Sequence, residues 1–329
     1  MRAIVITEPG GPEVLALRDV PPPSPGTGEV RVRVRATAVN RADLLQRMGM
    51  YPAPHDAPAD IPGLEFAGEI DALGPGARAA GGFDVGERVC GLAGGGTYAE
   101  HVVVHARTLA RIPDRLSFTE AAALPEACIT AYDAMVARGG LASGESLLVH
   151  AVGSGVGTAA VQIARALGAR VLGTARSASK LEPARALGLD VPIVAENGRF
   201  AEQVRAATGG RGVDVVLELV GGAYVEEDIA CVAPCGRIVL VGLMAGARAD
   251  VDLASLLRKR ITLVGTVLRA RPLEEKIAAG LAFARHVMPL VERGAVRPVI
   301  DAVLPLASAR EAHERVAGNA GFGKVVLEV

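Results

Sequence analysis

The chain has 329 residues, about the length of two ordinary domains, and half of them are hydrophobic. Its formal net charge of -1 gives no reason to expect nucleic acid or an anionic membrane as a partner. No apolar run is long enough to span a bilayer, and the first residues turn acidic too early for a secretory signal peptide, so we expect a soluble, cytoplasmic protein.

The first part of the chain, residues 1–118, is rich in short strand patterns. Positions 29–39 alternate apolar with mostly basic side chains, which is typical of a strand with one solvated face. Further strands, separated by glycine and proline turns, are expected at residues 3–7, 60–70, 83–91 and 97–104. Many short strands at this spacing favour a compact partial barrel.

From residue 119 the pattern changes to strands that alternate with helices. Helices are expected at residues 119–125, 130–138 and 274–291. Apolar strands are expected at residues 147–149, 169–174, 213–219, 236–242 and 261–267. This alternation predicts an α/β fold with a parallel, doubly wound sheet and right-handed crossovers.

The last residues, 323–329, have the pattern of a strand that we expect to return to the first domain. A dinucleotide-binding domain of residues 119–267 would then be inserted into a second domain, formed by residues 1–118 plus 268–329.

The four cysteines do not suggest a metal site. Only Cys231 and Cys235 are close together, and neither a second pair nor a nearby histidine completes a zinc ligand set. Two ordinary thiols are the simpler interpretation. Sparse cysteines without a pattern also fit a reducing compartment.

A glycine turn near the middle of the chain predicts a phosphate site. Gly153, Gly155 and Gly157 follow an apolar strand and precede a helical pattern over residues 158–167. Glycines let the backbone turn sharply and approach a pyrophosphate, and the N-terminus of the helix offers unpaired N–H groups. A glycine motif alone is weak evidence for such a site, but its place between a strand and a helix makes the prediction stronger.

The residues after the next strand bear on which dinucleotide binds. An acidic residue there would bind the ribose 2′-hydroxyl of NAD. This chain has Arg176, Ser177 and Lys180 instead, two cations and a hydroxyl. We interpret them as a site for the 2′-phosphate of NADP(H), and the alternative is a tight turn with solvated basic residues.

The whole chain resembles the medium-chain dehydrogenase/reductase superfamily, and within it the zeta-crystallin-like quinone oxidoreductases. The nearest branch by resemblance is the tumour-suppressor-inducible quinone oxidoreductase. The motifs that carry the resemblance run from end to end of the sequence, at residues 9–13, 40–51, 63–68, 121–131, 154–160, 242–246, 268–271 and 323–327. It implies a Rossmann cofactor domain inserted into a β-rich, GroES-like catalytic domain, and a homodimer that pairs the cofactor domains edge to edge.

The resemblance also implies chemistry without zinc. Zinc-dependent relatives carry a cysteine where this chain has Asn40 and a histidine where it has Leu64, and neither side chain replaces a thiolate or an imidazole on zinc. Without a Lewis acid to stabilise an alkoxide, interconversion of ordinary alcohols and ketones is not expected.

Site residues follow from the same motifs. Asn40 and Gln46 are expected to contact the substrate or the nicotinamide ribose, and Tyr51 to bond a substrate carbonyl or cover it. NADPH is expected to bind Thr130, Gly153, Ser154, Gly155, Val156, Gly157, Arg176, Ser177, Lys180, Gly242, Leu243, Met244, Leu268, Arg269 and Lys324. The family often has a tyrosine near the adenosine phosphate where this chain has Ala195. We therefore expect a lower affinity for NADPH than is typical of the family.

Three functions are consistent with these features. The leading one is an NADPH:quinone oxidoreductase. A quinone accepts hydride readily, so the enzyme mainly has to position it against the nicotinamide. The second is NADPH-dependent reduction of an activated carbon–carbon double bond, as in an enone, enal or enoyl thioester. The third is an NADPH-binding structural protein with little turnover, as the lens crystallins of this family suggest.

Overall fold

The computed structural model describes all residues from Met1 to Val329. They form two compact units. The first unit comprises Met1–Ile129, Leu268–Glu292 and Pro298–Val329, and the second comprises Thr130–Val267 and Arg293–Arg297. The first unit therefore continues past residue 118, where the sequence pattern changes. None of the helices combines the length and apolar character needed to cross a bilayer.

The first unit is built on a seven-stranded sheet and a separate two-stranded ribbon. The main sheet has the order β14-β15-β3-β4-β5-β7, and β6 pairs with β3. Its strands are β3 (Glu29–Val39), β4 (Glu65–Leu73), β5 (Arg88–Leu92), β6 (His101–His105), β7 (Leu109–Arg111), β14 (Ile300–Pro305) and β15 (Lys324–Glu328). The ribbon pairs β1 (Arg2–Ile6) with β2 (Leu15–Asp19).

Alternation along β3 explains why this strand is central. Val30, Val32 and Val34 are buried in the core, whereas the arginines between them face outward and pair with acidic side chains of β4. The closing strand β15 runs antiparallel to β3, with Val325 opposite Val39. The C-terminal strand thus returns to the first unit, as the sequence predicts.

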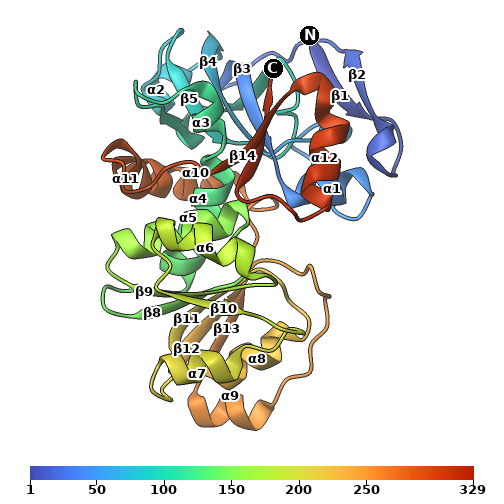
Figure 1. The fold of residues 1–329 in the computed structure, drawn as a ribbon. Helices are drawn as coiled ribbons and strands as arrows, with labels where there is room; N and C mark the ends of the chain where they lie inside the picture. The colour runs from blue at the N-terminus through green and yellow to red at the C-terminus, as the bar shows by residue number, and fades with distance from the viewer. The chain divides into compact units, whose positions relative to one another are not determined.

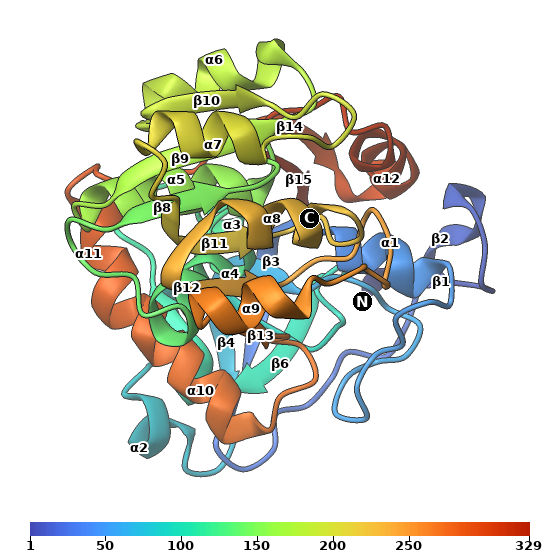
Figure 2. The ribbon, with the colours of Figure 1, turned by 90° about the horizontal axis from the view of Figure 1, so that it is seen from below.

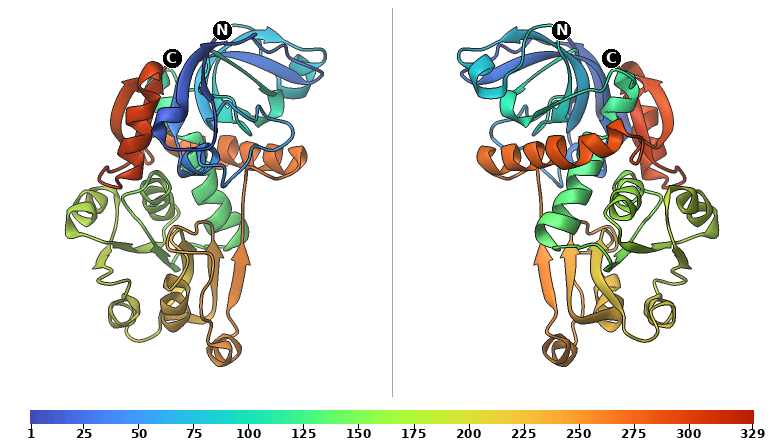
Figure 3. Two further views of the ribbon diagram at one scale, coloured as in Figure 1. Left: turned by 90° about the vertical axis from the view of Figure 1, so that its right-hand side faces the viewer. Right: turned by 90° about the vertical axis from the view of Figure 1, so that its left-hand side faces the viewer.

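Short helices complete the first unit. They are α1 (Arg41–Arg47), α2 (Ala77–Gly81), α3 (Phe118–Ala122), α4 (Pro125–Tyr132, in which the division between the units falls), α10 (Leu273–Ala282), α11 (Met288–Glu292) and α12 (Ala309–Ala317), with 3-10 turns at Pro12–Val14, Ala106–Thr108 and Leu306–Ser308. The helix expected over residues 274–291 is α10 and α11 joined by a π-helical segment, Phe283–Val287, which Figure 3 shows as one continuous rod.

The second unit is a doubly wound parallel sheet. Its strand order is β10-β9-β8-β11-β12-β13, and every neighbouring pair is parallel. The strands are β8 (Ser146–Val149), β9 (Arg170–Ala175), β10 (Val191–Val194), β11 (Val213–Glu218), β12 (Val232–Leu240) and β13 (Thr262–Gly265). This is the strand order of a Rossmann sheet, so the predicted fold class is confirmed.

Helices cover both faces of this sheet. On one face lie α5 (Gly155–Ala166) and α6 (Ala178–Leu187), and on the other lie α7 (Ala201–Ala207), α8 (Tyr224–Cys231) and α9 (Leu253–Lys259) (Figure 1). Figure 2 looks onto the second group, where α8 lies between α7 and α9. A π-helical segment, Asp133–Arg138, continues α4 and packs on β11 and β12. Apolar strands buried on both faces explain the near-continuous hydrophobic runs in the sequence.

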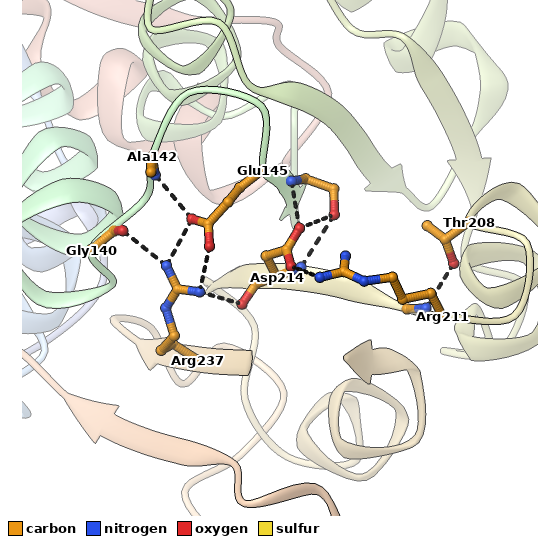
Figure 4. Close-up of polar contacts among 9 residues, drawn as sticks. Gly140, Ala142, Glu145, Thr208, Arg211, Asp214 and Arg237 are labelled. Atoms are coloured by element: carbon orange, nitrogen blue, oxygen red, sulfur yellow. Dashed lines mark hydrogen bonds and ion pairs between the residues drawn. The ribbon is translucent and has the colours of Figure 1, made fainter. Parts of the chain in front are cut away.

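A charged network ties neighbouring strands together toward their amino ends (Figure 4). Arg237 on β12 binds both carboxylate oxygens of Glu145, which precedes β8, at 2.8 and 2.9 Å. Asp214 on β11 accepts hydrogen bonds from the backbone and the hydroxyl of Ser146 and pairs with Arg211. These ion pairs are structural, because ligands of open α/β sheets bind at the opposite, carboxyl ends of the strands.

Candidate functional site

In the second unit, the strand order reverses between β8 and β11. In open α/β sheets, this reversal opens a crevice at the carboxyl ends of the strands, where ligands bind. The glycine turn leaves β8 at this point and leads into α5. The turn begins at Ala151, whose φ of 48° lies in the left-handed region that non-glycine residues seldom adopt.

The start of α5 offers hydrogen-bond donors to an anion. Ser154 caps the helix and accepts a hydrogen bond from the Gly157 backbone N–H at 3.0 Å. Gly155 and Val156 open the helix, so their N–H groups have no acceptor within it. Together with the helix dipole, they form a site suited to a phosphate.

Two glycines keep the turn, the helix and the sheet in close contact. A Cβ on Gly157 would lie 2.4 Å from the Ala151 carbonyl oxygen, and one on Gly173 would lie 2.3 Å from a methyl group of Val152. Only glycine fits at either position. The buried Gly153 lies between these contacts, within the turn itself.

The loops after β11 and β12 lie at the same carboxyl edge of the sheet and contact each other. The Ala245 N–H donates to the Val220 carbonyl at 2.7 Å, which joins the two loops. Leu243 and Met244 are 52% and 55% exposed. Gly242 lies against the Leu219 carbonyl, where a Cβ would be only 2.3 Å away. The predicted residues 242–244 therefore present apolar side chains at the carboxyl edge of the sheet.

The predicted 2′-phosphate residues follow the carboxyl end of β9. Arg176 and Ser177 are exposed, and Lys180 is partly exposed in the first turn of α6. The Ser177 hydroxyl lies 2.9 Å from that of Ser179. Ala195, directly after neighbouring β10, is buried, and its methyl side chain offers no polar group. Both groups of residues predicted to bind phosphates thus lie at one edge of one sheet.

In the first unit, the motif at residues 40–43 forms a capping box at the start of α1. The Asn40 backbone N–H donates to Asp43 Oδ2 at 2.7 Å, and Asp43 also accepts from the Gly63 N–H and the Tyr98 hydroxyl. Burial raises the pKa of Asp43 to about 6, although Lys324 and Arg269 oppose the shift. Asp43 therefore positions this helix from inside the core.

Asn40 belongs to a buried polar cluster with Lys324 and Glu65. Lys324 Nζ lies 2.6 Å from Glu65 Oε1 and 2.5 Å from Asn40 Oδ1, and the Asn40 amide donates to Glu65 at 2.9 Å. The second carboxylate oxygen of Glu65 accepts from the Glu126 N–H. The geometry thus places Lys324 and Asn40 together and adds Glu65, which is not among the predicted site residues.

A second cluster joins Gln46, Arg269 and Tyr51. Arg269 Nη2 donates to Gln46 Oε1 at 2.6 Å, and the Gln46 amide donates to the Ala59 carbonyl. The Arg269 guanidinium lies 5.3 Å from the centre of the Tyr51 ring. The partly exposed Tyr51 makes no hydrogen bond through its hydroxyl, whereas both polar atoms of the Gln46 side chain are engaged.

Two predicted residues lie where the chain passes from one unit to the other. Thr130 is buried and begins the second unit, and Leu268 is the residue at which the chain resumes the first unit.

The sequence patterns did not reveal a buried contact between Tyr98 and His313, which are 215 positions apart. The Tyr98 hydroxyl lies 3.2 Å from His313 Nε2. Burial lowers the pKa of His313 to about 3, so its ring is neutral in this contact.

Comparison with known proteins places this geometry in a family. Residues 26–114 match the model of the alcohol dehydrogenase GroES-like domain, and residues 155–284 match the model described as zinc-binding dehydrogenase. A solved NAD-dependent alcohol dehydrogenase is 35% identical, with a TM-score of 0.86 and 100% of both chains covered. The chain belongs to the medium-chain dehydrogenase/reductase superfamily.

Further known proteins are similar to this chain. The mycobacterial protein Rv1454c, solved in complex with NADPH, is 32% identical, with a TM-score of 0.87 over 100% of both chains. The quinone oxidoreductase of Escherichia coli, also solved with NADPH, is 28% identical, with a TM-score of 0.86 and 100% of both chains covered. Erythronolide synthase EryA2 of Saccharopolyspora erythraea is 47% identical over 188 residues, which are 56% of this chain but 5% of that synthase.

Proposed function

We propose that this superfamily member is an NADPH-dependent quinone oxidoreductase that works without a metal ion. The observation that carries the proposal is the pairing of a helix N-terminus, open to a pyrophosphate, with Arg176, Ser177 and Lys180 at the end of the next strand. The likeness to the quinone oxidoreductase of Escherichia coli supports the choice of acceptor. By resemblance we place the chain in the tumour-suppressor-inducible branch and in the cytoplasm.

The residues of the second unit fit the cofactor. The N–H groups of Gly155 and Val156 would hold the pyrophosphate, while the basic residues after β9 would hold the 2′-phosphate. Within this unit, Thr130 and residues 242–244 would hold the nicotinamide half. NADPH would supply the hydride, and the chain would supply orientation and exclusion of water.

Zinc does not fit the residues around Asn40. Its amide is engaged with Lys324 and Glu65, so a lysine ammonium already provides the cation next to this carboxylate. Burial raises the pKa of the Cys90 thiol to about 12, so this thiol is protonated in the protein without a metal. The zinc-binding dehydrogenase model matches residues 155–284, which contain neither Asn40 nor Leu64.

The same geometry divides the proposed substrate residues by role. Gln46 and Asn40 have their polar atoms committed to Arg269, Lys324 and Glu65, so we assign them to positioning. The Tyr51 hydroxyl is the donor still available, and we assign it to a carbonyl oxygen of the acceptor. A quinone requires little more, since solvent can deliver the proton after hydride transfer.

Turnover with a panel of acceptors tests this assignment. NADPH oxidation is expected with an ortho- or para-quinone and not with an enone or enoyl thioester. Tyr51→Phe is expected to lower kcat/KM for the quinone about tenfold, because one hydrogen bond of about 1 to 1.5 kcal/mol is lost. Met50→Leu, at a neighbouring side chain that is 70% exposed, is the matched control and should not change the rate.

The polyketide synthase relatives favour a second candidate, reduction of an activated carbon–carbon double bond. Turnover of the enoyl thioester in the same panel, with little turnover of quinones, would replace the leading proposal. An unchanged rate for Tyr51→Phe with quinones would remove Tyr51 from the acceptor site. Tight NADPH binding with no turnover of any acceptor would favour the structural role.

We also propose a homodimer formed through the edge of the second unit's sheet. Strand β13 has a neighbour only on the β12 side, and Leu263 and Val267 at this edge are 43% and 54% exposed. An unpaired apolar edge is a ready site for a second copy. Light scattering is expected to give twice the chain mass of 33.7 kDa, and a monomer at micromolar concentration would contradict the proposal.

A further inference from the structure

Three titratable side chains lie buried beneath the crevice of the second unit. His150 follows the last residue of β8, Glu218 ends β11, and Asp228 lies on α8. All three side chains are 0% exposed. The proposed cofactor chemistry uses none of them directly, yet they occupy the point where the strand order reverses.

The histidine ring is held on both of its nitrogens. Nδ1 lies 2.7 Å from the Thr174 hydroxyl, and Nε2 lies 2.8 Å from Asp228 Oδ1 and 3.6 Å from Glu218 Oε2. The rings of Phe200 and Tyr224 pack against it, with centroids at 4.7 and 5.0 Å. Water is therefore excluded from the group.

The two carboxyl groups need a proton between them. Glu218 Oε1 accepts from the backbone N–H groups of Val220 and Gly221, but Glu218 Oε2 and Asp228 Oδ2 accept no hydrogen bond. Two carboxylates cannot both remain ionised in a dry core beside a neutral imidazole. A proton on one carboxyl group, donated to the other in the hydrogen bond between the two side chains, would remove one charge.

The pKa values agree with a proton on the carboxyl pair. Burial raises the pKa of Glu218 to about 8, with the Asp228 charge adding to the shift. Burial likewise raises the pKa of Asp228 to about 7. The pKa of His150 is lowered by burial, so the ring is neutral near pH 7.

A metal ion explains the geometry less well. Two ligands at zinc distances of about 2.0 to 2.1 Å in a tetrahedral site stand about 3.3 Å apart. The 2.8 Å between His150 Nε2 and Asp228 Oδ1 is instead the length of a hydrogen bond.

We propose that this proton-sharing triad of His150, Glu218 and Asp228 positions the two cofactor loops, and that loss of its proton at alkaline pH weakens NADPH binding. His150 directly precedes the glycine turn, and Glu218 holds the loop after β11 through Val220 and Gly221. That loop in turn holds Ala245 of the loop after β12. The inference rests on the proposed cofactor.

Other charged groups near the triad do not replace its proton. Glu227, next to Asp228 on α8, accepts from the Phe200 and Ala201 N–H groups and pairs with Arg199, and its pKa is lowered. Its negative charge helps Asp228 to keep a proton. The remaining titratable and charged groups around the triad are Tyr224 and Cys231 on α8, Lys259 on α9, and Arg176 after β9.

The sign of the pH effect follows from the raised pKa values. In the unfolded chain these carboxyls release their protons near their ordinary values of 4.5 and 3.8, whereas the folded protein keeps them up to about 8 and 7. The folded state therefore binds more protons in this window, and stability falls as the pH rises through it. If the ordered loops require the shared proton, NADPH affinity falls as the pH passes 8.

Two isosteric variants test the proposal. In Asp228→Asn, the amide donates permanently to Glu218 while its oxygen still accepts from His150, and Glu218→Gln does the same from the other side. The Kd for NADPH, measured by calorimetry at pH 7 and pH 9, is expected to rise about tenfold for the wild type, as loss of one proton from a group with a pKa of about 8 implies, and to stay constant for both variants. Glu226→Gln, at an exposed position on the same helix, is the control and should retain the wild-type rise.

Three results would overturn the proposal. They are a wild-type Kd that does not change with pH, variants that follow the wild type, and one tightly held divalent metal ion per chain that is lost in Asp228→Asn. If no form binds NADPH at pH 7, the cofactor assignment fails on its own. Thermal unfolding of the free protein still tests the shared proton, because the wild-type Tm should fall between pH 5 and pH 8 more than that of either variant.

Discussion

Replacing Lys324 with methionine is expected to lower the free energy of unfolding of the first unit by about 3 to 5 kcal/mol. The side chains of Lys324 and Glu65 are 6% and 0% exposed, and Nζ lies 2.6 Å from the carboxylate. Methionine has a similar length but no charge, so the Glu65 carboxylate would remain buried without its cation. Urea unfolding followed by circular dichroism measures the loss.

A second variant separates loss of the ion pair from loss of packing. The double variant Glu65→Gln with Lys324→Met leaves no unpaired charge, so it should be more stable than the Lys324 single variant. Lys276→Met is the control, because its partner Asp56 is 62% exposed and such a pair contributes less than about 1 kcal/mol. Similar losses at Lys324 and Lys276 would mean that the buried pair contributes little.

Replacing Arg176 with alanine is expected to raise the KM for NADPH by about 10- to 100-fold, with kcat little changed. A hydrogen bond to a charged group contributes about 1.5 to 3 kcal/mol, and each 1.4 kcal/mol is about a factor of ten. The guanidinium is exposed at the end of β9, where a 2′-phosphate would lie. The KM for NADH, which lacks this phosphate, should change less than about twofold.

The comparison with NADH distinguishes the loss of a contact with the 2′-phosphate from a general loss of cofactor affinity. Arg170→Ala, at the opposite end of the same strand, removes an exposed arginine far from the predicted phosphate and should leave both KM values unchanged. Equal increases for NADPH and NADH in Arg176→Ala would mean that Arg176 does not read the 2′-phosphate. The chain would then have no demonstrated preference for NADPH.

The local patterns in the sequence were sufficient for the architecture. Alternation over residues 29–39 predicted β3 with its observed bounds, because side chains alternate across a strand whatever surrounds it. The strand, glycine turn and helix around Gly155 also occur as predicted, since neighbouring residues determine them. Boundaries were less certain: the strand expected at residues 97–104 begins only at His101, where pairing with β3 starts.

The contacts within the sites were not visible in the sequence. Lys324 meets Asn40 because β15 pairs with β3 in a register that sets Val325 opposite Val39, and no local pattern encodes that register. Gln46 accepts a hydrogen bond from Arg269, 223 positions away, and our proposal of a positioning role for Gln46 rests on this contact.

The sequence by itself therefore determined the class of fold, the order of its elements and the glycine turn, because each depends on residues that are close together in the chain. Only the tertiary structure decided which polar groups are buried together, away from water. The proposed proton-sharing triad joins the residue after β8, the end of β11 and α8, and no local sequence pattern groups its three members. Burial and long-range pairing, rather than residue type, give these side chains their pKa values and their partners.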